Sequence, residues 1–209
     1  MQWRSLTRII PTAAVTAIVA WPAVAAQGDP DWPCIQRKVP ELSLGQIWTD
    51  AELPQTAADW SKDAAVSALV MELSARRVPL PEAQEKISEY AKSLPEGERE
   101  RRMTMLVQGL FDHMNRERAD VIAGIARYAR KQRDMAALLR QEASAVDVLR
   151  AKPDADANEI VLRSDRLAFQ TRIFQERTQS LGFVCEVPTL IEQRLYALAK
   201  TIAEALKAR

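Results

Sequence analysis

Glycine, aromatic residues, cysteine and histidine are all scarce in this sequence. Six glycines and 6% aromatic residues argue against a sandwich or barrel built from many short strands. The single histidine, His113, excludes any site that needs two imidazoles. A formal net charge of +1 lacks the basic excess that is typical of nucleic-acid-binding proteins. Apolar residues, by contrast, make up 47% of the 209, which is enough for a sizeable core.

The first 26 residues have the pattern of a secretory signal peptide. Residues 1–8 contain two arginines and no acid, and an apolar run follows over residues 9–26. Small side chains end this run, which predicts cleavage between Ala26 and Gln27. An uncleaved membrane anchor is the alternative, but the run is short for a span and is interrupted by prolines. We therefore expect a periplasmic or secreted protein with no stable membrane span after signal removal.

Two cysteines, Cys34 and Cys185, remain after the predicted cleavage. Exported chains with a small, even number of cysteines usually pair them, so we expect a structural disulfide. Two buried thiols or one reactive thiol are the alternatives. Neither cysteine has a neighbouring histidine or a Cys-x-x-Cys partner that would activate it, so redox chemistry is disfavoured.

Prolines divide the rest of the chain into candidate helices, because proline breaks a helix except in its first turn. Residues 27–55 are rich in proline and turn residues but also apolar, which predicts an extended segment lying along a helical surface and held by Cys34. The shorter helices are expected over about Ala57–Arg77 with Thr56 as N-cap, from Pro81 to Leu94, and from Pro188 to about Leu206.

The longest stretch without proline, Glu96 to Lys152, predicts a helix of about 80 Å. From Phe111 onward it follows a heptad repeat in which nine of twelve seam positions are apolar, as in a coiled coil. A turn at Pro153 and a second helix over about Ala157–Leu181, ended or kinked by Gly182, predict an antiparallel return. Pairing of residues 111–149 between two chains, giving a homodimer, is the competing arrangement.

These elements define an all-α fold. It comprises a signal peptide (1–26), an extended, disulfide-tethered segment (27–55) and a small helical bundle (56–209), from which an antiparallel coiled-coil hairpin of about 129–181 projects. Counting around the turn places residues 182–208 beside residues 102–128. No repeat beyond the heptads is evident.

Candidate chemistry is sparse. His113 has Glu117 one turn away and methionines nearby, a combination that suggests a copper or nickel sensor. Met103, however, does not share the histidine's helical face, which favours core methionines and a hydrogen-bonded histidine. A locally basic stretch, formed by Arg127, Arg130, Lys131 and Arg133, could bind an anionic partner or be a solvated helix face. No catalytic, cofactor or metal-ligand set is predicted.

We therefore expect a non-enzymatic, exported helical interaction protein, an adaptor or chaperone-like helper that binds a protein partner in the cell envelope through its hairpin and grooves. A small periplasmic metal-binding or metal-sensing protein is the alternative. No cofactor and no nucleic-acid partner are expected.

Overall fold

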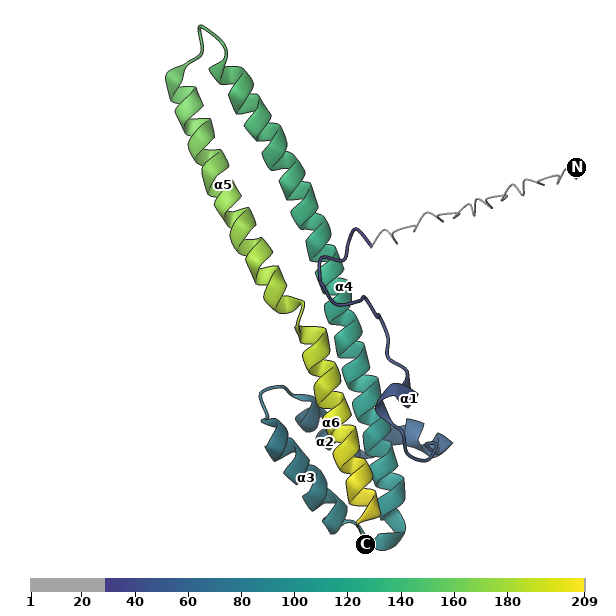
Figure 1. Ribbon diagram of the computed structural model, residues 1–209. Helices are drawn as coiled ribbons and strands as arrows, with labels where there is room; N and C mark the ends of the chain where they lie inside the picture. Colours follow the sequence, from purple (N-terminus) through teal and green to yellow (C-terminus); the bar gives the residue numbers. More distant parts are fainter. Residues whose placement is uncertain (1–28, 209) are drawn as a thin grey trace, which may run out of the picture.

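The computed structural model describes residues 29–208, and all regular structure in this range is helical (Figure 1). The predicted signal peptide and its cleavage site between Ala26 and Gln27 lie outside the described residues. The all-α class is confirmed. In chain order the elements are α1 (Leu44–Ile47), the 3₁₀ helix η1 (Gln55–Lys62), α2 (Ala64–Ser74), α3 (Leu80–Ser93), α4 (Glu96–Arg150), α5 (Ala157–Val184) and α6 (Val187–Lys207).

The bundle forms where the first half of α4 packs against α6, α2 and η1, and where α3 covers α6 (Figure 1). Its core is aliphatic, because each of these helices buries one apolar face. The largest fully buried side chains include Leu73, Leu106, Leu110, Leu195 and Leu198. Truncating any one of these leucines to alanine costs about 2–5 kcal/mol of folding free energy.

Helix α4 is 55 residues long, and α5 returns along its outer half after a turn over residues 151–156 (Figure 1). We call this part, residues 129–181, the arm. None of the twelve predicted seam positions on α4 is exposed. Five of them are buried, namely Met114, Arg118, Ile125, Gln132 and Val146. The heptad pattern therefore predicted the covered face of α4 correctly.

The polar residues at seam positions bond to neighbouring elements. Gln132 donates to the Phe174 carbonyl at 3.4 Å, and Glu142 accepts two hydrogen bonds from Arg163 at 2.9 and 3.0 Å. These bonds favour one alignment of α5 against α4, because a shift of either helix would leave polar groups unpaired.

Two predicted boundaries were wrong. The helix expected from Ala57 is split into η1 and α2, because Asp63 rather than Thr56 caps α2: its carboxylate accepts from the backbone amides of Ala65 and Val66 at 3.1 and 3.2 Å. Gly182 does not end α5, which continues to Val184. No described glycine has a positive φ, so this residue takes ordinary helical geometry.

Two other elements pack tightly against α4 at Gly109. A Cβ atom there would lie 2.7 Å from the Val70 side chain and 2.9 Å from the Trp60 ring, so the absence of a side chain allows α2 and η1 to sit directly on α4. Within residues 29–208, no helix is both long and apolar enough to span a membrane.

Candidate interaction surface

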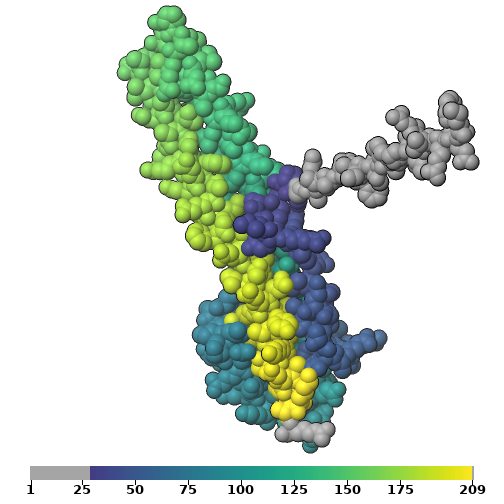
Figure 2. All heavy atoms as spheres, in the orientation of Figure 1, coloured from purple at the N-terminus to yellow at the C-terminus, as the bar shows by residue number. Residues whose placement is uncertain are grey.

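The described chain begins beside the point where α5 meets α6. A disulfide joins Cys34 to Cys185 with their Cα atoms 5.5 Å apart, which confirms the predicted pairing. Further along, the Asn115 side chain accepts from the Leu42 amide at 3.0 Å and donates to the Leu42 carbonyl at 3.4 Å. Figure 2 shows this N-terminal segment lying across the middle of the molecule, next to the end of α5. We call residues 29–43 the strap.

Arg118 is the most deeply buried charge at this junction, with 5% of its surface exposed. Its guanidinium donates to the Val39 carbonyl of the strap at 2.6 Å and lies 3.5 Å from the Glu192 carboxylate of α6. Loss of hydration lowers the pKa of Arg118, and the Glu192 charge opposes this shift. One side chain thus links strap, α4 and α6, and its ion pair agrees with the register counted from the sequence.

The four basic residues of the predicted patch are divided by the structure. Arg130 lies 3.1 Å from the Asp31 carboxylate, and Arg133 bonds both Asp31 and the Pro30 carbonyl. Arg127 and Lys131 are exposed. Half of the patch therefore binds a carboxylate of the strap, an anion from the protein's own chain.

An apolar groove lies at the root of the arm, between α4 and the last turns of α5. It has a volume of about 450 Å³. We call it the junction groove; its lining residues are Val121, Gly124, Ile125, Tyr128, Ser180, Leu181 and Val184. The neighbouring Phe183 exposes 69% of its surface to solvent. Such a hollow, apolar and next to an exposed aromatic ring, is suited to an apolar side chain of another molecule.

Gly124 lines this groove on the α4 side and puts no side chain into it. A Cβ atom there would have one neighbour, the end of the Arg127 side chain, at 3.8 Å. Packing within the chain therefore does not require glycine, although glycine costs a helix interior about 1 kcal/mol relative to alanine. The residue leaves backbone accessible where a partner could approach closely.

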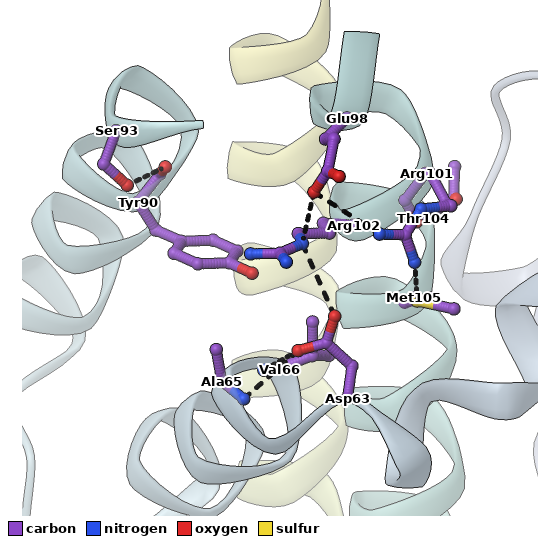
Figure 3. Close-up of polar contacts among 10 residues, drawn as sticks. All are labelled: Asp63, Ala65, Val66, Tyr90, Ser93, Glu98, Arg101, Arg102, Thr104 and Met105. Atoms are coloured by element: carbon purple, nitrogen blue, oxygen red, sulfur yellow. Dashed lines mark hydrogen bonds and ion pairs between the residues drawn. The ribbon is translucent and has the colours of Figure 1, made fainter. Parts of the chain in front are cut away.

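A polar cluster joins α2, α3 and α4 in the bundle (Figure 3). Arg102 of α4 lies 2.9 Å from Glu98 and 3.4 Å from Asp63, and the Tyr90 ring of α3 lies beside its guanidinium. Burial raises the pKa of the Tyr90 hydroxyl. Since Asp63 also caps α2, the cluster aligns three helix ends, a structural role for each of its members.

The surroundings of His113 give little support to the metal-binding alternative. Asp112 already accepts from the Trp60 indole at 2.9 Å, and Glu117 lies 3.7 Å from Arg76. Met103 is fully buried in the core. In the part of the chain that the structure describes, no three His, Cys, Asp or Glu side chains are grouped closely enough to hold a metal ion.

Comparisons with family models, with curated proteins and with solved structures found no match to this chain. The candidate surface therefore rests on the geometry alone. Sequence reasoning missed the junction groove, whose one visible signal was a glycine inside a long helix. It also missed the exposed apolar residues on the outer face of α5, such as Leu162 and Phe169, which occur seven residues apart.

Proposed function

We propose that this chain is an exported, non-enzymatic interaction protein, an adaptor or chaperone-like helper, that binds an apolar segment of a protein partner in the junction groove. The observation that supports this most directly is the apolar groove beside exposed Phe183, floored by a glycine that internal packing does not need. Buried apolar anchors in preformed hollows provide most of the affinity in protein interfaces.

The arm and the strap have complementary roles in this proposal. The arm is an antiparallel coiled-coil hairpin, supported by the covered heptad positions of α4 and by the Glu142–Arg163 pair. The extended strap holds the root of the arm rigid through Cys185 and Arg118. A groove between fixed walls loses little conformational entropy when a partner binds, which favours affinity.

Export agrees with the chemistry of the chain. The leader-like pattern of residues 1–26 directs a protein out of the cytoplasm, and a disulfide persists in an oxidising compartment. We propose a periplasmic or secreted location. N-terminal sequencing of the protein isolated from its source should give Gln27 as the first residue; a chain that starts at Met1 and is recovered from the cytosol would contradict this.

The groove is tested by filling it. Gly124→Leu places a side chain where the partner would bind, and the nearest obstacle is the mobile end of Arg127. Gly97→Leu is the matched control, because Gly97 lies in the first turn of α4 with no atom within 4 Å of its added Cβ. Both variants should keep the circular dichroism spectrum of the native chain.

The readout is photo-crosslinking in the cell envelope, with a benzophenone amino acid at Tyr128. A discrete crosslinked protein is expected with the native groove and with Gly97→Leu, and it should be lost with Gly124→Leu. The proposal is wrong if no crosslink forms, or if the crosslink is unchanged when the groove is filled.

A further inference from the structure

Helix α5 has a second regular face, which is turned away from α4 over most of its length and reaches the junction groove at Ser180. Its positions alternate by four and three residues, as the contact positions of a paired helix do. We call it the outer stripe: Leu162, Arg166, Phe169, Ile173, Glu176 and Ser180. Leu162 and Phe169 expose 62% and 55% of their surface, although both side chains are strongly apolar. A solvated helix face does not call for leucine and phenylalanine seven residues apart.

The outer stripe lies on the arm, which consists of two packed helices, whereas the bundle below it is built from more than two. Below it, α6 is covered by α4 on one side and by α3 on the other, and it buries six residues. Among the helices, α5 packs extensively against α4, and Leu181 is the one buried residue of α5. In Figure 2 the edge of the arm formed by α5 is bare above α3.

We infer that the outer stripe is the interface of an antiparallel dimer of this chain, in which opposite residues have numbers that add up to 342. The stripe is complementary to itself when read backward. Arg166 then faces Glu176 of the partner subunit, and Phe169 faces Ile173 of the partner subunit. Two-fold symmetry repeats each contact, so the centre is apolar and one ion pair flanks it on either side.

Charge sets the direction of this pairing. In a parallel dimer Arg166 would face its own copy, and so would Glu176, which places like charges together. The antiparallel register pairs opposite charges instead. Glu176 has one ion pair within the described chain, with Arg172 at 3.7 Å, and both side chains are about two-thirds exposed, so its carboxylate remains accessible to a second cation.

This register fixes which segments lie opposite each other at the ends of the arms. The turn of the partner's arm, residues 151–156, would lie opposite residues 186–191, at the start of α6. One turn later Arg194 of α6 donates to the Leu73 carbonyl of α2 at 2.7 and 2.9 Å, at the level where α2 reaches α6.

This inference goes beyond the proposed function and is tested on other residues. The junction groove is filled at Gly124 of α4, whereas the dimer is perturbed at Arg166 and Glu176 of α5. Ser180 belongs to both surfaces and is left unchanged. A native chain that dimerises but gives no crosslinked partner would therefore count against the groove alone, and one that gives a crosslinked partner but does not dimerise would count against the dimer alone.

A charge exchange on the chain without residues 1–26 provides the first test. Sedimentation equilibrium should show a dimer. Arg166→Glu or Glu176→Arg creates two like-charge contacts, and at about tenfold each they should raise the dimer dissociation constant about 100-fold. The double exchange restores opposite charges and should restore the dimer. Arg116→Glu, an exposed change on α4, is the control and should leave the dimer intact.

Cysteine crosslinking provides the second test, of direction and register. Chains with Arg166→Cys mixed with chains with Glu176→Cys should form an intermolecular disulfide, whereas neither variant alone should. Crosslinking of each variant with itself would indicate a parallel pair and overturn the inference. A native chain that remains monomeric at 100 µM, on the order of the weakest dimers of use in a cell, would also overturn it, as would a dimer unaffected by both single exchanges.

Discussion

Removing the disulfide is the most direct perturbation of the junction. Cys34→Ser together with Cys185→Ser opens a loop of 151 residues. The chain-entropy relation assigns such a loop about 5 kcal/mol, as an upper value. The strap keeps its other bonds, namely those of Leu42 with Asn115 and of Val39 with Arg118, so the native fold should persist at lower stability.

The expected loss is large enough to measure by thermal and urea unfolding. For a chain of this size, 1 kcal/mol corresponds to about 2–4 °C in Tm, so the serine variant should melt about 10–20 °C lower. The m-value should change as well, because the unfolded chain becomes less constrained. Reductant should shift the native chain to the same midpoint and leave the serine variant unchanged. A loss below about 1 kcal/mol would refute the reasoning that the bond acts by closing a long loop.

Other predictions concern single side chains and are checked by urea unfolding. Gly109→Ala should destabilise the fold by about 1–3 kcal/mol, because its Cβ meets packed side chains, whereas Gly124→Ala should stabilise it by about 0.5–1 kcal/mol; equal effects would contradict the packing argument. Asp63→Ala removes the α2 cap and should cost about 1 kcal/mol, and Asp63→Asn should recover most of that. The hydrogen bond from Arg163 lowers the pKa of Glu142, so this pair should stabilise the fold above the ordinary carboxyl pKa and cease to do so as the pH falls through the lowered value. Glu142→Gln should flatten that part of the stability-pH curve, and an unchanged curve would contradict the assignment.

Much of the fold follows from periodicity and proline placement. Pro95 precedes α4 and Pro188 lies in the first turn of α6, so the boundaries of the longest elements could be read from the sequence. The heptad frame identified the covered face of α4, because burial on a helix must repeat with the helical period. The cysteine pairing followed from the predicted export and the small cysteine count.

The parts that could not be predicted depend on competition between local signals. Thr56 and Asp63 can both serve as N-caps, and the sequence alone does not distinguish between them. In the structure Asp63 caps α2 and also lies 3.4 Å from Arg102. The sequence also did not predict which residues of the basic patch would be paired within the chain. That pairing depends on Asp31, about 100 residues away in the chain, which the strap brings to Arg130 and Arg133.

The continuity of α4 has a mechanical consequence. The helices that pack along it are divided, since α5 ends at Val184 and α6 begins at Val187, whereas α4 passes the same level without a break. A sideways load on the tip of the arm is therefore carried to the bundle by one continuous helix, and the disulfide lies at the level where α5 gives way to α6. The buried Leu106 and Leu110 lie on this same helix, some 40 residues from its outer end, so the arm and the core of the bundle share one continuous element.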